Sequence, residues 1–383
     1  MLSNQKYSGR SACLIAAVSL SLLGGLAGAA APDDLNRLAK DRQADLARMQ
    51  QNLQGDKQRI GGNIKEMQDA PKNWQSELGQ DFQIWSNELG KDVGAWQIVG
   101  RRAQGDYLMP TLGTTSAVDY VTVQGLARRY LIIRNSEPKP NAPLVIMMHA
   151  HGLSPEKMGN LTRAGRLAFA FGVVMILPEA VNEAWNQDPS ANKGADDVAF
   201  ISALIDRAIA QYGVNPKRVY AEGYSSGGFM AARLGCELSS KIAGIGEVAA
   251  TMRGSMKQIC APARTVPTAV IAGTADTVVP YNGIFEALQS APDTLSMWSN
   301  LAKCTGEIVT THIDNDTDNT AITLERHEGG TGGAEMRLYT VIDGGHTWPG
   351  SPYAAYTLGL GRTSRDIDAT LELWSFFSQY SLP

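Results

Sequence analysis

The chain has 383 residues, which is long for one ordinary domain but fits a large α/β core of about 250 residues with an appended segment. Hydrophobic residues make up 44% and charged residues 19%, which excludes an intrinsically disordered or collagen-like chain. The net charge of −4, from 34 basic and 38 acidic residues, gives no indication of nucleic-acid binding.

Residues 1–29 have the three-part pattern of a secretory signal peptide. Lys6 and Arg10 precede an uncharged apolar run, which ends in small residues including Ala27-Gly28-Ala29. A retained membrane anchor is the alternative, because about 20 uncharged residues could just span a bilayer. The small residues favour cleavage, so we expect a secreted or periplasmic protein.

Residues 30–112 form a polar, helix-favouring extension without a strand-like run. An eleven-residue repeat begins at Trp74 and again at Trp85, and Trp96 begins a third copy. At 3.6 residues per turn the three tryptophans lie on one apolar stripe. We expect the stripe to pack against the main domain or against a second copy of the chain. The alternative is a surface that contacts an insoluble or membrane substrate.

From about residue 120 onward the chain alternates between predicted strands and helices. The predicted strands are 120–123 and 128–134, joined as a hairpin, and then 144–150, 172–178, 218–223, 268–273 and 336–342. Most are continuous apolar runs, which is typical of a parallel sheet buried on both faces. Helices are predicted after Asp196-Asp197 and over 366–380. Residues 113–383 are therefore predicted to form a doubly wound α/β domain with helices on both faces of a mainly parallel sheet.

Three cysteines remain after removal of the predicted leader: Cys236, Cys260 and Cys304. Because exported proteins fold in an oxidising compartment, a disulfide is expected, and the odd number leaves one thiol over. We predict a bridge between Cys236 and Cys260, which would close a loop of about 25 residues. The spacing does not suggest a metal site.

The segment Gly223-Tyr224-Ser225-Ser226-Gly227 matches the pattern G-x-S-x-G between a predicted strand and a predicted helix. A sharp turn at this junction forces the serine into a strained conformation, and side chains at the flanking glycines would collide with the turn. Ser225 is therefore the predicted nucleophile. A serine hydroxyl needs a neighbouring base, which is oriented in turn by a carboxylate.

Asp276 and His346 are the predicted carboxylate and base, because each follows a buried strand downstream of the serine. The other histidines fit less well. His149 and His151 precede the serine, whereas His312 and His327 lie in a polar stretch with no predicted strand leading into them. Three aspartates remain as alternatives to Asp276, namely Asp206, Asp314 and Asp343.

Two backbone amides are expected to stabilise the oxyanion that develops during acyl transfer. One is the amide of Ser226, which follows the nucleophile, and the other is the amide of Leu153, in the loop after strand 144–150. His149 and His151 could instead be metal ligands, but no carboxylate or cysteine partner is evident nearby. We expect neither a metal nor a cofactor.

The segments PLVIMMHAHG, GADDVAFISALIDRAIAQYGVNPKRVYAEGYSSGGFMA, AGTADTVVPY and GGHTWPG resemble the secreted polyhydroxybutyrate depolymerase and feruloyl or acetylxylan esterase family of α/β hydrolases. The resemblance covers about residues 113–383 and implies the same triad. It places Trp185-Asn186 near the substrate cleft. Trp185 and Trp348 could each be a packing anchor or a substrate contact. Family members often carry a cysteine that would pair with Cys304, and the corresponding segment RHEGGTGGAEM has none.

These observations predict a secreted serine esterase that works through an acyl-enzyme, with a hydroxyalkanoate polymer or oligomer as substrate. A feruloyl or acetylxylan esterase would use the same residues and is the first alternative. The second is a non-catalytic binding protein on a hydrolase scaffold, with the stripe of Trp74, Trp85 and Trp96 as its contact surface.

Overall fold

The structure, a computed structural model, describes residues 107–189, 195–352 and 359–383. The predicted leader and the tryptophan stripe lie outside the described residues. The described end of the predicted extension, residues 107–112, packs on the domain that follows. The side-chain amide of Asn160 donates to the carbonyl of Tyr107 at 2.6 Å, and its oxygen accepts from the amide of Met109 at 2.7 Å.

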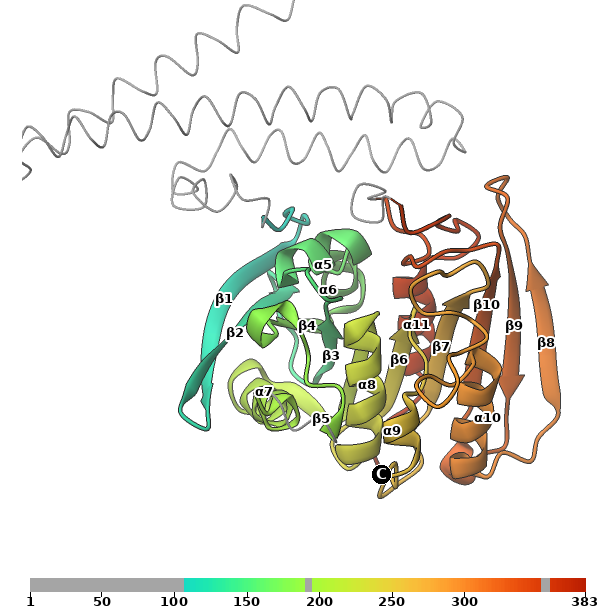
Figure 1. Cartoon of the computed structure of the whole chain (residues 1–383). Helices are drawn as coiled ribbons and strands as arrows, with labels where there is room; N and C mark the ends of the chain where they lie inside the picture. Colours follow the sequence, from blue (N-terminus) through green and yellow to red (C-terminus); the bar gives the residue numbers. More distant parts are fainter. Residues whose placement is uncertain (1–106, 190–194, 353–358) are drawn as a thin grey trace, which may run out of the picture. The chain divides into compact units, whose positions relative to one another are not determined.

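A ten-stranded sheet runs through the described residues, in the order β1-β2-β4-β3-β5-β6-β7-β10-β9-β8 (Figure 1). The strands are β1 Thr114–Val123, β2 Leu126–Asn135, β3 Ala142–Met148, β4 Val174–Pro178, β5 Val214–Tyr224, β6 Gly244–Val248, β7 Thr268–Gly273, β8 Ile308–Ile313, β9 Ala321–His327 and β10 Met336–Ile342. The neighbours from β4 to β10 pair in parallel, whereas β1, β2, β9 and β8 add antiparallel edges. This is the α/β-hydrolase fold, as predicted.

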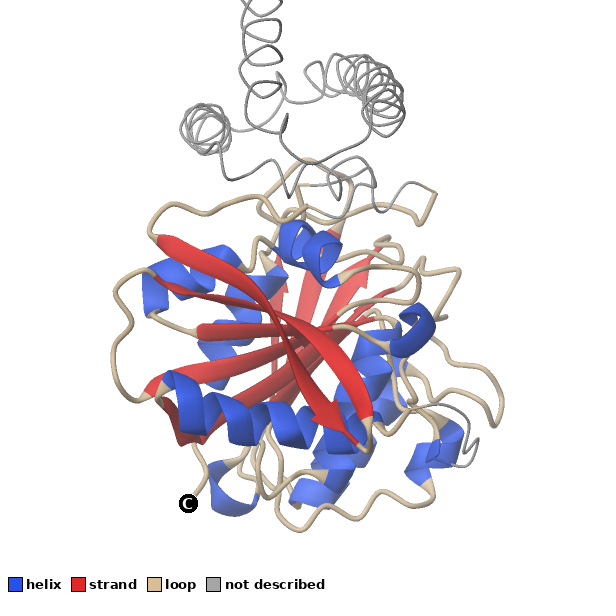
Figure 2. Ribbon diagram, turned by 90° about the vertical axis from the view of Figure 1, so that its left-hand side faces the viewer, coloured by secondary structure: helices blue, strands red, loops and turns tan. Residues whose placement is uncertain are grey.

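Helices cover both faces of the twisted sheet (Figure 2). On one face lie α7 (Asp197–Tyr212), α8 (Ser226–Glu237), α9 (Gly254–Lys257) and α10 (Ala291–Ala302), and on the other α5 (Pro155–Thr162), α6 (Gly165–Phe171) and α11 (Ala369–Phe377). Every residue of β3, β4, β6 and β7 is buried, which explains their continuous apolar or small character. Among the described helices, none has the length and apolarity needed to cross a membrane.

The polar stretch that contains His312 and His327 forms two strands, so the expectation that no strand leads into these histidines is wrong. His312 lies within β8 and His327 ends β9. Both strands belong to the antiparallel edge of the sheet, where side chains are partly exposed. Such strands do not need the apolar runs that identify the buried centre.

The predicted disulfide is present between Cys236, in the last turn of α8, and Cys260, just after α9. Cys304 is a half-buried free thiol whose pKa is raised by burial. The bridge therefore links the helix that follows Ser225 to the segment that leads into β7.

Removing this bridge is expected to destabilise the domain. In the chain-entropy model, replacing Cys236 and Cys260 by serine lowers the free energy of unfolding by about 3 kcal/mol, because the denatured chain regains loop freedom. Denaturant unfolding of the double variant measures the change, with Cys304→Ser as the control. An unchanged unfolding midpoint would contradict the expected contribution.

Two glutamates are completely buried in adjacent central strands, Glu222 in β5 and Glu247 in β6. Burial raises the pKa of both carboxyls to about 8. The indole N–H of Trp298 donates to Glu247 at 2.9 Å, which partly offsets this rise, whereas neither oxygen of Glu222 has a hydrogen-bond partner among the described residues. Both groups therefore favour the protonated form in the folded protein.

The buried Glu222 predicts a pH-dependent stability. Because its folded pKa lies above its unfolded pKa, its stabilising effect is complete below the unfolded value of about 4.5 and is lost as pH rises through about 8. In Glu222→Gln, the loss of stability between about pH 5 and pH 8.5 should shrink by about 2 to 4 kcal/mol. Urea unfolding across this range measures it, and the exposed substitution Glu137→Gln is the control. An equal pH slope in Glu222→Gln and the wild type would refute the prediction.

Candidate active site

Ser225 lies at the turn between β5 and α8, with φ 53° and ψ −114°. The chain can form this strained turn only with glycine at the two flanking positions of the motif, because neighbouring backbone atoms leave no room there for a Cβ. A Cβ at Gly223 would lie 2.2 Å from the carbonyl oxygen of Gly227, and a Cβ at Gly227 would lie 2.1 Å from the carbonyl oxygen of Met148. The two glycines of the motif are thus required for the turn that presents Ser225.

Three side chains from the carboxyl ends of β5, β7 and β10 meet at this turn. His346 Nε2 lies 2.9 Å from Ser225 Oγ, and His346 Nδ1 lies 2.7 Å from Asp276 Oδ2. With Nδ1–H donating to the carboxylate, Nε2 is left as an acceptor for the serine proton. Residues separated by up to 121 positions in the sequence are therefore within hydrogen-bond distance, as predicted from their places after buried strands.

The carboxylate of Asp276 is fixed by its own loop. Its second oxygen accepts hydrogen bonds from the amides of Val278 and Val279, both at 2.8 Å. The alternatives lie elsewhere or lack this geometry: Asp206 on α7 pairs with Lys241 at 2.7 Å, and His346 bonds Asp276 rather than Asp314 or Asp343. Asp276 is the carboxylate that orients the imidazole.

Tyr224 supports His346 from the side of the nucleophile turn, a contact that sequence reasoning missed. Its hydroxyl donates to the His346 carbonyl at 2.5 Å, and the two rings lie 5.4 Å apart. Burial, followed by the charge of Asp276, raises the pKa of Tyr224 well above its usual value, so the hydroxyl stays a donor. Its place inside the G-x-S-x-G motif was the available signal.

The Ser226 amide is in the first turn of α8, where helix N–H groups have no intrahelical acceptor. The Ser226 hydroxyl donates to Gln187 Oε1 at 3.1 Å, which holds this residue in place. Leu153 differs from the prediction, because its amide donates to the Ala150 carbonyl at 3.1 Å within a tight turn. Among the described residues the Ser226 amide has no acceptor, whereas the Leu153 amide is engaged in this turn.

The loop after β3 is secured by His149 and Trp185. His149 is fully buried, and burial lowers its pKa to about 4, so the ring is neutral. Its Nε2 accepts from the amide of Ala180 at 3.1 Å, and its carbonyl accepts from the indole N–H of Trp185 at 2.9 Å. Trp185 is only 5% exposed. Of its two readings, the structure favours the packing anchor.

The other two candidate substrate contacts, Trp348 and Asn186, both make internal hydrogen bonds. Trp348 is 1% exposed and donates its indole N–H to Thr370, so of its two readings the structure favours the packing anchor. Asn186 is half-buried, its amide donates to Asp197 at 2.6 Å, and its carbonyl accepts from Arg233 at 2.6 Å. Its backbone thus stabilises the loop that carries Gln187.

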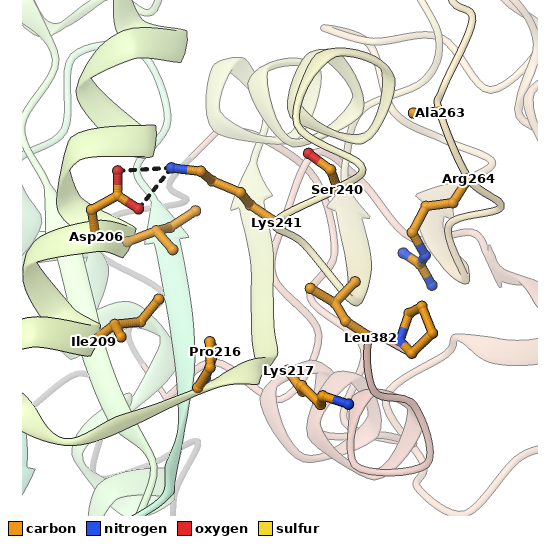
Figure 3. Close-up of a pocket in the computed structure, with 11 residues that line it drawn as sticks. Asp206, Ile209, Pro216, Lys217, Ser240, Lys241, Ala263, Arg264 and Leu382 are labelled. Carbon is orange, nitrogen blue, oxygen red and sulfur yellow. Dashed lines mark hydrogen bonds and ion pairs between the residues drawn. The ribbon is translucent and has the colours of Figure 1, made fainter.

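A surface cavity lies at the opposite end of β5 from Ser225 (Figure 3). Its walls include Asp206 and Ile209 from α7, Lys217 near the start of β5, and Arg264. At about 3.3 Å per residue, the strand separates Lys217 from Ser225 by more than about 20 Å. This cavity is therefore distinct from the triad.

The geometry supplies the parts of a nucleophilic acyl transfer. A hydroxyl is hydrogen-bonded to an imidazole, the imidazole is oriented by a carboxylate, and an amide next to the hydroxyl can face a developing negative charge. In this arrangement the imidazole can take the proton of the serine hydroxyl and pass it to the oxygen of a leaving alcohol.

The chain is similar in sequence to esterases. The family model described as Esterase PHB depolymerase matches residues 133–289. Feruloyl esterase B of Piromyces equi is 29% identical over 259 residues, which are 63% of this chain and 43% of that protein. The poly(3-hydroxybutyrate) depolymerase of Ralstonia pickettii is 29% identical over 148 residues, which are 34% of this chain and 30% of that protein. The chain thus spans less than half the length of both relatives.

Among solved structures, the acetyl xylan esterase of Aspergillus awamori is 14% identical, with a TM-score of 0.46 over 58% of this chain and 92% of that one.

Proposed function

We propose that this protein is a serine esterase that hydrolyses carboxylic esters through an acyl-enzyme. The premise is the match of residues 133–289 to the esterase PHB depolymerase family model. The hydrogen bond of 2.9 Å between His346 Nε2 and Ser225 Oγ is the observation that carries this proposal. A binding protein on the same scaffold would not need a nucleophile, a base and an orienting carboxylate in one continuous hydrogen-bonded line.

In the first half of the reaction, Ser225 Oγ attacks the ester carbonyl carbon while its proton passes to His346 Nε2. The carbonyl oxygen becomes negative and accepts a hydrogen bond from the Ser226 amide. The bond between the carbonyl carbon and the leaving oxygen then breaks, and His346 gives its proton to that oxygen. The alcohol departs, leaving the acyl group on Ser225.

In the second half, water takes the place of the alcohol. His346 accepts a proton from the water as it attacks the acyl carbon, and returns a proton to Ser225 when the ester to the enzyme breaks. Asp276 remains ionised throughout and stabilises the imidazolium that forms twice in each cycle. Because a carboxylic acid and an alcohol are the only products, the cycle balances without a cofactor.

We propose a hydroxyalkanoate polymer or oligomer as substrate, since the matched family model bears the name of polyhydroxybutyrate depolymerases. A feruloyl or acetylxylan ester is the second candidate, supported by the identity of 29% to feruloyl esterase B over a longer stretch than to the depolymerase. Secretion is part of the proposal. The leader pattern of residues 1–29 and the bridge between Cys236 and Cys260 support it.

A fluorophosphonate probe and three ester substrates test the proposal. The probe should add once per chain, and mass spectrometry of the digest should place it on Ser225. Release of 3-hydroxybutyrate, ferulate and acetate is then compared on a polyhydroxybutyrate film, a feruloylated oligosaccharide and acetylated xylan. A protein that neither reacts with the probe nor cleaves any of the three would rule out the esterase, and faster ferulate or acetate release would select the second candidate.

A further inference from the structure

The backbone around His346 is held by a segment of the connection between β10 and α11. We call residues 360–366 the return segment. The His346 amide donates to the Leu360 carbonyl at 2.6 Å, and the Gly345 amide donates to the Arg362 carbonyl at 2.9 Å. The approach is so close that a Cβ at Gly345 would lie 2.1 Å from the Leu360 oxygen. The position of the imidazole therefore depends on where the return segment lies.

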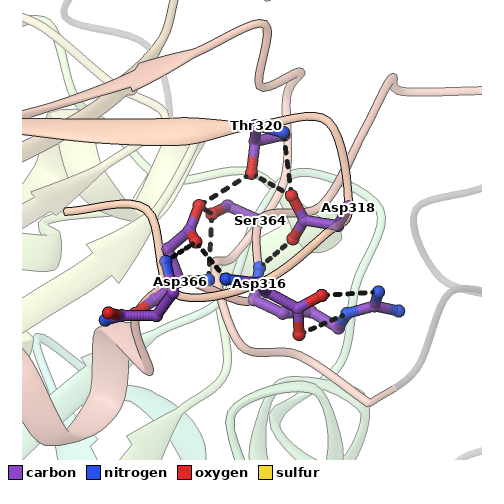
Figure 4. Close-up of polar contacts among 7 residues, drawn as sticks. Asp316, Asp318, Thr320, Ser364 and Asp366 are labelled. Carbon is purple, nitrogen blue, oxygen red and sulfur yellow. Dashed lines mark hydrogen bonds and ion pairs between the residues drawn. The ribbon is translucent and has the colours of Figure 1, made fainter. Parts of the chain in front are cut away.

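The return segment is itself tied to the turn between β8 and β9. We call this turn, residues 314–320, the acidic turn. The buried carboxylate of Asp366 accepts hydrogen bonds from the amides of Asn315 and Asp316, at 2.7 and 3.0 Å, through one oxygen (Figure 4). Its other oxygen lies 3.0 Å from the Ser364 hydroxyl and 3.1 Å from the Thr320 hydroxyl. One carboxylate thus joins two segments about 50 residues apart.

Two further contacts connect the acidic turn to the return segment, both through Arg365. Asp318 accepts from the amide of Arg365 at 2.6 Å, and the Arg365 guanidinium pairs with Asp316 at 3.0 Å. The Thr320 hydroxyl also lies 2.5 Å from Asp318, so that one hydroxyl is shared by two carboxylates. A carboxylate that accepts several hydrogen bonds in a buried site forms strong, directional contacts. The acidic turn is therefore a rigid point of attachment.

We propose that the acidic turn and Asp366 act as a positioning device for His346. The line of contacts runs from the turn to Asp366, through the return segment, to the His346 amide. Loosening Asp366 frees the return segment and lets Nε2 move relative to Ser225 Oγ. A misplacement of about 1 Å at reacting atoms can cost about 100-fold in rate. The proposal rests on the proposed function of the triad.

Thr320 allows a matched test, because Thr320→Val removes the hydroxyl at constant shape and Thr320→Ser keeps it. We expect labelling of Ser225 by a small fluorophosphonate to slow by about 10- to 100-fold in Thr320→Val and to return to within about threefold of the wild type in Thr320→Ser. Kinetics with p-nitrophenyl butyrate should show a lower kcat with KM within about twofold. The exposed β1 substitution Thr122→Val is the control for the chemical change.

Misplacement of the histidine must be separated from loss of folded protein. Titration of active sites gives the fraction that reacts, whereas the labelling rate constant reports how well Ser225 is activated in that fraction. If Thr320→Val reduces only the fraction, or labels at the wild-type rate, the proposal is overturned. If Thr320→Val does not fold, the same decision is made on Ser364→Ala, which removes one donor to the same carboxylate.

Failure of the esterase proposal gives a different result. If the wild type does not react with the probe, the function proposed above is wrong. The positioning role is then decided by NMR spectra of the His346 imidazole at one pH, whose ring chemical shifts should differ between Thr320→Val and Thr320→Ser because its hydrogen bonds to Ser225 and Asp276 change. Identical ring chemical shifts would overturn the positioning role alone.

Discussion

Ser225→Ala is expected to lower kcat for p-nitrophenyl butyrate by about four to six orders of magnitude, leaving only the slow reaction that binding and oxyanion stabilisation can support. The substitution removes the atom that forms the acyl-enzyme, and neither His346 nor Asp276 can replace it. KM should change little, because the hydroxyl contributes to bond formation more than to ground-state binding.

The fold should tolerate this change. Alanine has no group larger than the serine that already occupies φ 53°, and the close contacts of the turn fall on Gly223 and Gly227 instead. Ser116→Ala, on the exposed strand β1, is the matched control and should retain full activity. Steady-state kinetics on freshly purified protein measures both variants. Equal rates in Ser225→Ala and the wild type would exclude Ser225 as the nucleophile.

The buried centre of the fold was predictable because its strands are short apolar runs between turn residues. Strands β3, β4, β5, β7 and β10 were each anticipated, as were the helices that begin at Asp197 and Ala369. Strand β6 was not, because the sequence GIGEV contains two glycines and a glutamate. Its glycines fit there because a Cβ at Gly246 would lie 2.9 Å from Leu373, so packing against α11 decides the residue rather than strand propensity.

Strands β8 and β9 were missed for a different physical reason. They form the antiparallel edge, where each face of the sheet is at least partly open to water, and their sequences IVTTHI and AITLERH mix polar and apolar side chains. The pairing of β9 with β10, which brings β8 into the sheet through β9, is a long-range property that local composition does not carry. The acidic turn between them looked like a polar loop, and its bonds to Asp366 could not be inferred from sequence spacing.

The convergence of these three side chains was predictable to the residue, whereas the contacts of the surrounding residues were not. Ser225, Asp276 and His346 each follow the carboxyl end of a recognisable strand, so topology alone brings them together. Leu153 and Trp348 were assigned by their nearness in sequence to the loop after β3 and to His346. The amide of one is used in a turn and the indole of the other is buried in the core, and both facts depend on tertiary packing.

Asp276→Asn is expected to lower kcat by about 10,000-fold. The asparagine oxygen can still accept from the amides of Val278 and Val279, so the loop is retained. Its NH₂ group then faces His346 Nδ1 and donates to it, which moves the imidazole proton to Nε2. In this tautomer Nε2 cannot accept the proton of Ser225.

Asp343→Asn tests whether the loss is specific to the orienting carboxylate. Asp343 is an exposed aspartate three residues before His346, with φ 56°, a backbone conformation that asparagine adopts as readily. This control should stay within about threefold of the wild type, because no bond to the imidazole is lost. Measuring kcat/KM for p-nitrophenyl butyrate against pH compares the variants. A loss below tenfold in Asp276→Asn would show that the carboxylate does not select the tautomer of His346. The backbone contacts of His346 would then have to orient its imidazole for base catalysis.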